Sequence, residues 1–231
     1  MAVIYLIRHG QASFNHENYD QLSDLGMEQA KLLGDSLARQ NVVPDAIYQG
    51  AMQRHHQTAH HSLGRYTSDI PVFTMSQWNE YDHREILAKY DERLATPQST
   101  KALISSNPNP MALFQKLFVA AVGRWTSGEF DDDYKESWQD FTSRVQQAFL
   151  QVKESGHRRI VVYTSGGPIS LICAQLLGLP LEQFMKINWT LVNGSITKII
   201  LNDRNGQPML SSVNEHAIFS EIDSKKLITY T

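Results

Sequence analysis

Short apolar runs of strand length alternate along the chain with longer segments whose apolar residues recur at helical spacing. The predicted strands are 3–8, 45–48, 71–75, 158–164, 195–201 and 209–213. The predicted helices begin at Ser23 and near Met52 and cover 84–95, 110–126, 137–154 and 171–177. Because strands and helices alternate, the pattern predicts an α/β fold around a mostly parallel mixed sheet.

The helix that begins at Ser23 is clearly marked at the level of sequence. Ser23 is a natural N-cap, and one apolar face follows it through Leu25, Ala30, Leu33 and Leu37. The region 84–156 is helical throughout and interrupts the alternation. We therefore predict a single domain over 1–231 with a helical insertion at 84–156 that returns to the sheet.

The first strand ends abruptly in Arg8, His9 and Gly10. A strand as apolar as 3–7 is expected in the middle of a sheet, and its carboxyl end opens into the crevice where α/β folds bind ligands. A cation, an imidazole and a residue without a Cβ atom at that point indicate an anionic substrate and a nucleophile. Alone, the triplet is short enough to occur by chance.

A second strongly apolar strand, 158–164, leads through Ser165, Gly166 and Gly167 into a helix. The free N–H groups at the start of a helix bind anions, and Pro168 suits its first turn. A glycine-rich turn between a strand and a helix is also common without a ligand. Cys173 lies within the helix and is interpreted as a buried, inert thiol.

Composition narrows the function classes. The 231 residues carry a formal net charge of −3, which argues against a nucleic acid or an anionic membrane as a partner attracted by bulk charge. A single cysteine excludes an internal disulfide and fits a reducing compartment. No basic leader or membrane-spanning run is found, so we expect a soluble, cytoplasmic protein.

Four histidines, His55, His56, His60 and His61, fall on the helix predicted near 52–63. His56 and His60 are four residues apart and could share one face as metal ligands. However, no glutamate lies between them in the zinc-protease pattern, and no cluster of cysteine or aspartate follows. An ordinary helix face is the favoured interpretation, and we predict no metal and no cofactor.

Several motifs together resemble the histidine phosphatase superfamily, also called the phosphoglycerate mutase-like family. They are Leu6-Ile7-Arg8-His9-Gly10-Gln11 with Asn15, Leu22-Ser23-x-x-Gly26-x-x-Gln29-Ala30, Arg54-x-x-Gln57-Thr58-Ala59, Asn79-Glu80, and 161–168. They follow the order of the family across most of the chain, and the segment 84–156 is the least covered.

The resemblance implies a three-layer α/β/α sandwich with a phosphate pocket at the strand ends. His9 would attack phosphorus and carry a phosphohistidine, while Glu80 would protonate the leaving oxygen. The resemblance also implies phosphoryl-oxygen ligands: Arg8, Asn15, Arg54, Ser165 and Gly166. This chemistry agrees with physical expectation, because fixed donors and charge neutralisation account for most of the catalysis of phosphoryl transfer, and arginine forks fit oxyanions.

Ser165 departs from the pattern of the family, which normally has a second histidine at this position. A serine hydroxyl is shorter and uncharged, and the loss of one preorganised donor commonly lowers a rate by about a hundredfold or more. Three outcomes follow: a slow enzyme, another side chain in the vacated space (His83 is the candidate), or phosphate binding without catalysis.

We expect a metal-independent phosphatase that acts on a small-molecule phosphomonoester, because His9, Arg8, Arg54 and Glu80 all remain. The alternative is a catalytically impaired phosphate-binding or interaction protein with the same fold. A phosphoglycerate-type mutase is less favoured, because the insertion carries an acidic stretch at 129–136 where a bisphosphate calls for basic residues. The sequence does not determine the substrate or the oligomeric state.

Overall fold

The computed structural model describes residues 1–13, 20–64, 69–202, 204–219 and 226–230. The chain divides into two compact units. The first contains Met1–Glu80 and Val145–Thr231, and the second is Tyr81–Arg144. No helix within the described ranges is both long and apolar enough to cross a membrane.

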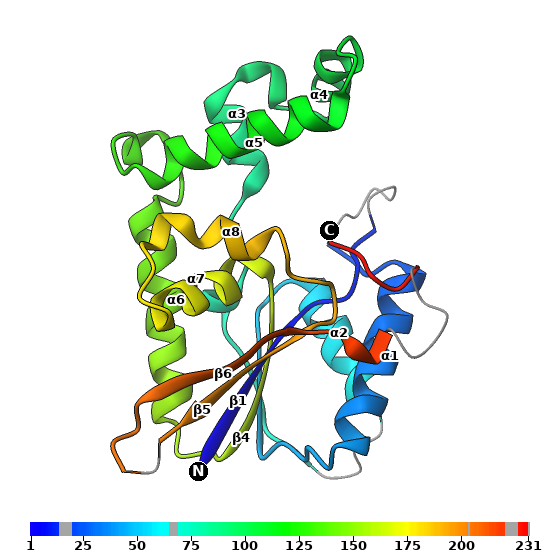
Figure 1. Cartoon of the computed structure of the whole chain (residues 1–231), viewed down its shortest axis with the longest axis vertical. Coiled ribbons are helices and arrows are strands. Elements are labelled where there is room, and N and C mark those ends of the chain that lie inside the picture. Colours follow the sequence, from blue (N-terminus) through cyan, green and yellow to red (C-terminus); the bar gives the residue numbers. More distant parts are fainter. Residues whose placement is uncertain (14–19, 65–68, 203, 220–225, 231) are drawn as a thin grey trace. The chain divides into compact units, whose positions relative to one another are not determined.

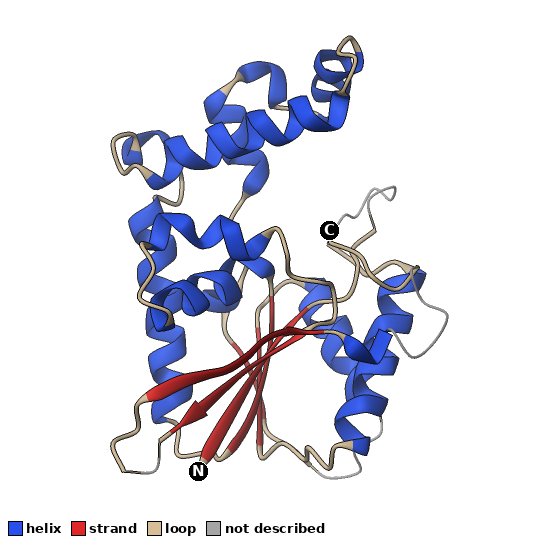
Figure 2. Ribbon diagram, in the orientation of Figure 1, coloured by secondary structure: helices blue, strands red, loops and turns tan. Residues whose placement is uncertain are grey.

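A six-stranded mixed sheet forms the centre of the first unit (Figure 2). Its strands are β1 (Ala2–Arg8), β2 (Ala46–Gln49), β3 (Val72–Thr74), β4 (Arg159–Thr164), β5 (Ile196–Leu201) and β6 (Pro208–Glu215), in the order β3-β2-β4-β1-β5-β6. The first four strands in this order are mutually parallel, and β5 and β6 run antiparallel to them. The predicted α/β fold with a mostly parallel mixed sheet is confirmed.

Helices cover both faces of this sheet (Figure 1). Helices α1 (Asp24–Arg39) and α2 (Gln53–Leu63) lie on one face, and α7 (Gly166–Leu176) lies on the other, as does the part of α6 (Trp138–Glu154) that belongs to the first unit. The short α8 (Met185–Asn188) follows α7. Ser23 caps α1 as predicted, because its hydroxyl accepts the backbone N–H of Gly26 at 3.0 Å. Helix α7 begins at Gly166, five residues before the predicted start.

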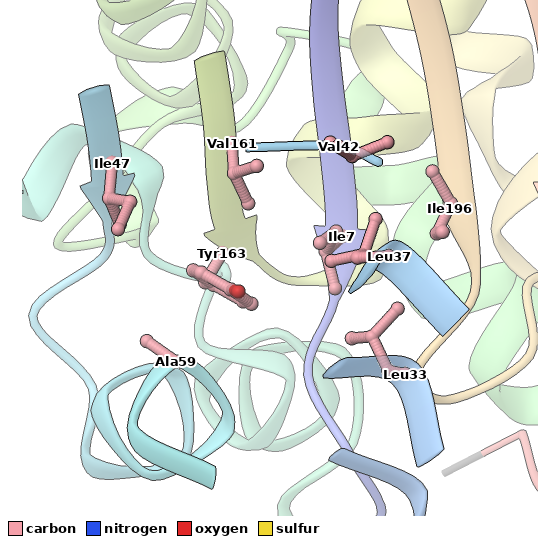
Figure 3. Close-up of a cluster of buried hydrophobic side chains, with 9 residues drawn as sticks. All are labelled: Ile7, Leu33, Leu37, Val42, Ile47, Ala59, Val161, Tyr163 and Ile196. Atoms are coloured by element: carbon pink, nitrogen blue, oxygen red, sulfur yellow. The ribbon is translucent and has the colours of Figure 1, made fainter. Parts of the chain in front are cut away.

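The core between the sheet and α1 and α2 consists mostly of apolar residues from the predicted strands and helices, joined by Val42 from the loop between α1 and β2 (Figure 3). Its buried members are Ile7, Leu33, Leu37, Val42, Ile47, Ala59, Val161, Tyr163 and Ile196. The phenol of Tyr163 is buried as well, and it hydrogen-bonds the hydroxyl of Ser62 at 2.6 Å. This rigid base fixes the carboxyl ends of β1 and β4.

The second unit is helical, as predicted for the insertion. It contains α3 (His83–Tyr90), α4 (Pro97–Ser105), α5 (Pro110–Thr126) and the first turns of α6, around a cluster of aromatic rings in mutual contact: Tyr81, Trp125, Trp138 and Phe141. Helix α4 was not predicted, although Thr96 caps it in a capping box and Pro97 occupies its first position. The single-domain organisation stays a prediction.

Candidate active site

The parallel strands β1 and β4 bring two polar turns side by side. Arg8 lies opposite Thr164 in the register of the two strands, and the backbone N–H of His9 donates to the Thr164 carbonyl at 2.9 Å. His9 and Ser165, which directly follow these residues, therefore leave the sheet at adjacent points. This is the edge where the sequence predicted a ligand crevice.

The His9 imidazole is buried, with 5% of the residue exposed, and both of its nitrogens have partners. Nδ1 lies 2.7 Å from the Gly10 carbonyl, and Nε2 accepts the Nε–H of Arg54 at 3.1 Å. A carbonyl can only accept, so Nδ1 carries the proton and Nε2 the lone pair. Burial, followed by the charge of Arg54, holds the pKa of His9 well below its ordinary value of 6.5, so the ring is neutral at pH 7.

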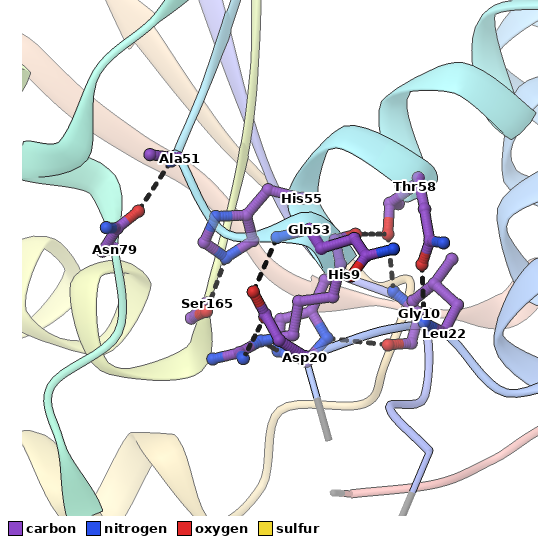
Figure 4. Close-up of polar contacts among 12 residues, drawn as sticks. His9, Gly10, Asp20, Leu22, Ala51, Gln53, His55, Thr58, Asn79 and Ser165 are labelled. Atoms are coloured by element: carbon purple, nitrogen blue, oxygen red, sulfur yellow. Dashed lines mark hydrogen bonds and ion pairs between the residues drawn. The ribbon is translucent and has the colours of Figure 1, made fainter. Parts of the chain in front are cut away.

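Arg54 reaches His9 from the first turn of α2. Its Nη1 forms an ion pair of 2.7 Å with Asp20, whose other carboxylate oxygen accepts the backbone N–H of Gln53 at 2.8 Å (Figure 4). The Thr58 hydroxyl donates to the Arg54 carbonyl at 2.7 Å and accepts the N–H of Gly10 at 3.1 Å. These bonds join α2 to the turn that carries His9, and they fix the guanidinium against the imidazole.

Arg8 is also buried, and backbone carbonyls hold its guanidinium. Its Nη1 donates to the Leu191 carbonyl, and its Nη2 donates to the carbonyl of Tyr230 at 3.1 Å. The tail beyond Glu215 carried no sequence signal, yet through Tyr230 it contributes directly to the surroundings of the site. No periodic pattern announces such a contact, because it uses the backbone.

Ser165 occupies the N-cap position of α7, and its hydroxyl does not cap the helix. Its Oγ lies instead 2.7 Å from Nε2 of His55, which comes from α2 (Figure 4). A Cβ atom on the neighbouring Gly166 would lie 2.2 Å from Oδ1 of Asn188, so a side chain at position 166 would displace the Asn188 amide. Ser165, Gly166 and His55 are all buried.

The N-terminus of α7 does bind an anion, which belongs to the chain itself. Both oxygens of the Glu80 carboxylate accept the N–H of Gly167, at 3.1 and 3.2 Å. This places Glu80 at the turn that also carries Ser165. The geometry agrees with the expectation that this strand–helix turn attracts negative charge.

The structure thus brings Arg54 into contact with His9 and Glu80 to the turn of Ser165 and Gly166. Asn15 lies outside the described residues, so its predicted role stays a prediction. His83, the candidate for the missing imidazole, is the first residue of α3 and belongs to the second unit. His55 was not predicted to belong to the site, because it is one of four histidines on the same helix and the sequence indicates no partner for any of them.

The other histidines of α2 have ordinary surroundings. His56 Nδ1 is hydrogen-bonded to Nε2 of Gln49 at 2.7 Å, and the rings of His60 and His61 contact one another. Within the described part of the chain, no three histidine, cysteine, aspartate or glutamate side chains gather closely enough to hold a metal ion.

Comparison with known proteins places this arrangement in a family. The sequence model of the histidine phosphatase superfamily (branch 1) matches residues 4–112 and 110–215. A 2,3-bisphosphoglycerate-dependent phosphoglycerate mutase of Leifsonia xyli subsp. xyli is 34% identical over 205 residues, which cover 80% of this chain and 81% of the mutase.

Solved structures show the same fold. A phosphoserine phosphatase from Entamoeba histolytica in complex with 3-phosphoglyceric acid aligns with a TM-score of 0.60 at 22% identity, over 94% of this chain and 99% of its own. A phosphoglycerate mutase from Bacillus anthracis aligns with a TM-score of 0.62 at 19% identity, over 94% of each chain.

Proposed function

Because the chain belongs to the histidine phosphatase superfamily (branch 1), we propose that it hydrolyses small phosphomonoesters through a phosphohistidine on His9. One observation carries this proposal. The His9 ring is neutral and buried, and the Gly10 carbonyl fixes its Nδ1 proton, so Nε2 presents its lone pair beside the guanidinium of Arg54. A nucleophilic imidazole needs this protonation state and this fixed orientation.

In the first step Nε2 of His9 forms a bond to phosphorus while the bond from phosphorus to the ester oxygen breaks. The Nε–H of Arg54, which Nε2 accepts in the free protein, turns to a phosphoryl oxygen as the lone pair is used. Arg8, Asn15, Ser165 and Gly166 are the further proposed ligands of these oxygens. The Nδ1–H bond to Gly10 persists and stabilises the positive charge that the phosphorylated ring acquires.

Glu80 completes the proposed reaction. In its protonated form it gives a proton to the leaving alkoxide, and as a carboxylate it then takes one from the water that attacks the phosphohistidine. The oxygen of that water bonds to phosphorus as the bond from phosphorus to Nε2 breaks, which releases phosphate and restores His9, while the two proton transfers of opposite direction restore Glu80. Its position at the N–H of Gly167, on the turn that follows β4, supports a place at the site, and this N–H stabilises the carboxylate that acts in the second step.

Transfer of the phosphoryl group to an alcohol instead of water is the second candidate function. The 34% identity with a phosphoglycerate mutase favours it, because a mutase and a phosphatase can share one phosphohistidine. Retention of phosphate binding without turnover is the third outcome, and it follows if Ser165 leaves too little charge stabilisation in the transition state.

The test compares the wild-type protein with His9→Ala and with His60→Ala, a matched change on the exposed side of α2. Phosphate release from para-nitrophenyl phosphate, phosphoserine and sugar phosphates is measured, as is the isomerisation of 3-phosphoglycerate with bisphosphoglycerate added. We expect His9→Ala to lose all turnover and His60→Ala to keep it, with an acid-labile phosphoprotein trapped only where His9 is present.

Equal turnover by the wild-type protein and His9→Ala would overturn the proposal. Saturable phosphate binding that is lost in His9→Ala, without any product from the wild-type protein, would establish the phosphate-binding alternative instead.

A further inference from the structure

His55 is a buried imidazole that the proposed reaction has not yet used. It lies in the first turn of α2, directly after Arg54, and it has no exposed surface. Its ring centroid is 5.7 Å from that of His9, and its Nε2 is 2.7 Å from Ser165 Oγ (Figure 4). A second imidazole therefore lies beside the nucleophile, bonded to the residue that the family resemblance singles out.

Gly50, the residue after β2, makes room for this ring. A Cβ atom at Gly50 would lie 2.2 Å from His55 Nδ1, so any larger residue would displace the imidazole. Nδ1 has no hydrogen-bond partner among the described residues. Space for the ring is thus provided on one side, and a single hydrogen bond orients it on the other.

This hydrogen bond indicates which nitrogen of His55 carries the proton. If Nδ1 were protonated, its N–H would point toward the backbone of Gly50, but no described group meets it in hydrogen-bond geometry. If Nε2 is protonated, it donates to Ser165 Oγ, and only an acceptor is left without a partner. Burial, followed by the charge of Arg54, holds the pKa of His55 well below 6.5 and keeps the ring neutral.

Ser165 is consequently directed away from its usual local role. Serine at an N-cap normally accepts a backbone N–H of the first turn, but here Glu80 takes the N–H of Gly167. If His55 donates to Ser165 Oγ, the hydroxyl proton of Ser165 remains available for another acceptor. The acceptor that we assign to it is an oxygen of the phosphoryl group transferred to His9.

We propose that His55 is a positioning residue, which orients Ser165 so that its hydroxyl donates to a phosphoryl oxygen during transfer to His9. The inference rests on the proposed function and assigns the vacated imidazole space to His55, in place of His83. Ser165 is fully buried in the free protein, so the phosphoryl group reaches its hydroxyl only after neighbouring side chains move.

The first experiment varies His55 at constant size. In His55→Gln the side-chain amide retains a donor near the position of Nε2, whereas His55→Leu has none. We expect kcat in His55→Leu to fall by about ten- to a hundredfold with little change in KM, as for the loss of one preorganised donor. His55→Gln should stay within about fivefold of the wild-type kcat.

A double-mutant cycle between His55 and Ser165 shows whether His55 acts by orienting Ser165 or only by filling space. Ser165→Ala should lower kcat by a similar factor, and the double variant His55→Leu/Ser165→Ala should be no slower than Ser165→Ala. Additive losses, or equal losses in His55→Leu and His55→Gln, would overturn the inference. Thermal unfolding identifies any variant that does not fold. If His55→Leu is such a variant, the kcat values of His55→Gln and Ser165→Ala decide, because the inference expects only Ser165→Ala to be slow.

The second experiment exchanges the two positions. Because Nε2 of His55 already lies 2.7 Å from Ser165 Oγ, a histidine at 165 has no space while His55 is present. Ser165→His alone should lower turnover, and His55→Ala/Ser165→His should recover at least tenfold over it. Faster turnover by Ser165→His alone would show that His55 does not hold this space. Loss of the proposed function is recognised separately, because His9→Ala would then equal the wild-type protein.

Discussion

The carboxyl ends of β1 and β4 are neighbours in the sheet, but they are built in different ways. The end of β1 carries charge: Arg54 contacts the His9 imidazole, and the charge of Arg8 acts on it from the neighbouring residue. The end of β4 is neutral at its centre, where Ser165 and His55 share one hydrogen bond between side chains. At the first end backbone carbonyls hold the side chains of Arg8 and His9, whereas the second end depends on a hydrogen bond between two side chains.

This difference indicates what each end contributes to phosphoryl transfer. Fixed charges beside His9 lower the pKa of the nucleophile and neutralise the incoming oxyanion, and both effects require rigid positions. A single neutral donor at Ser165 stabilises the transition state less than these charges do. Its orientation depends on one partner, His55, which is 110 positions away in the sequence. Substitutions at the end of β1 should therefore have larger effects than those at the end of β4.

The largest expected effect is that of Arg54→Lys. A lysine retains one positive charge, but it lacks the planar fork that contacts His9 and Asp20 together. We expect kcat/KM to fall by about a hundred- to a thousandfold, as for the loss of a transition-state donor. Arg39→Lys, at the exposed end of α1, is the matched control. Similar values for the two variants would remove Arg54 from the site.

Two glycine substitutions test whether the end of β1 is held by backbone contacts and the end of β4 by side-chain contacts. A Cβ atom on Gly10 would lie 2.4 Å from the backbone oxygen of Gly26, and one on Gly50 would lie 2.2 Å from His55 Nδ1. Because a side chain can move and a helix backbone cannot, Gly10→Ala should lower the free energy of unfolding by about 3 kcal/mol or more, and Gly50→Ala by about 1–2 kcal/mol.

Gly50→Ala should nevertheless show the kinetic loss of His55→Leu, because it expels the same ring. Gly64→Ala, which meets nothing within 4 Å, serves as the control for adding a methyl group. Urea denaturation of the four proteins measures the comparison. A lower free energy of unfolding for Gly50→Ala than for Gly10→Ala would contradict the proposed difference between the two strand ends.

The same contrast explains how much could be predicted from the sequence. The end of β1 is a contiguous motif after an apolar run, so Arg8 and His9 could be assigned to a sheet edge directly. The capped helix α1 and the strands were equally readable, because period and capping are local properties. The predicted role of Asn15 stays a prediction.

The end of β4 could be read only in part. His55 and Ser165 are 110 positions apart, and no local pattern indicates that one will bond the other. The carbonyl of Tyr230 and the carboxylate of Asp20 were overlooked for the same reason, since each acquires its role only when the chain folds. The start of α7 was placed too late because two glycines weaken the helical signal at 166–167.

The smallest expected effect concerns acid stability. Both His9 and His55 have pKa values lowered by burial, while in the unfolded chain they return to about 6.5. The unfolded state therefore binds more protons below pH 6.5, and stability that is fully present above this pH is lost as the pH falls. Each such histidine adds at most about 1.4 kcal/mol per pH unit to that loss.

His55→Gln removes one of the two groups and keeps the hydrogen bond to Ser165, so its free energy of unfolding should decline less steeply than that of the wild-type protein between pH 6.5 and 5. Chemical denaturation at half-unit pH intervals measures both slopes. Parallel curves would mean that His55 is not held neutral by its surroundings. The end of β4 would then be charged like the end of β1, and the contrast between the two strand ends would disappear.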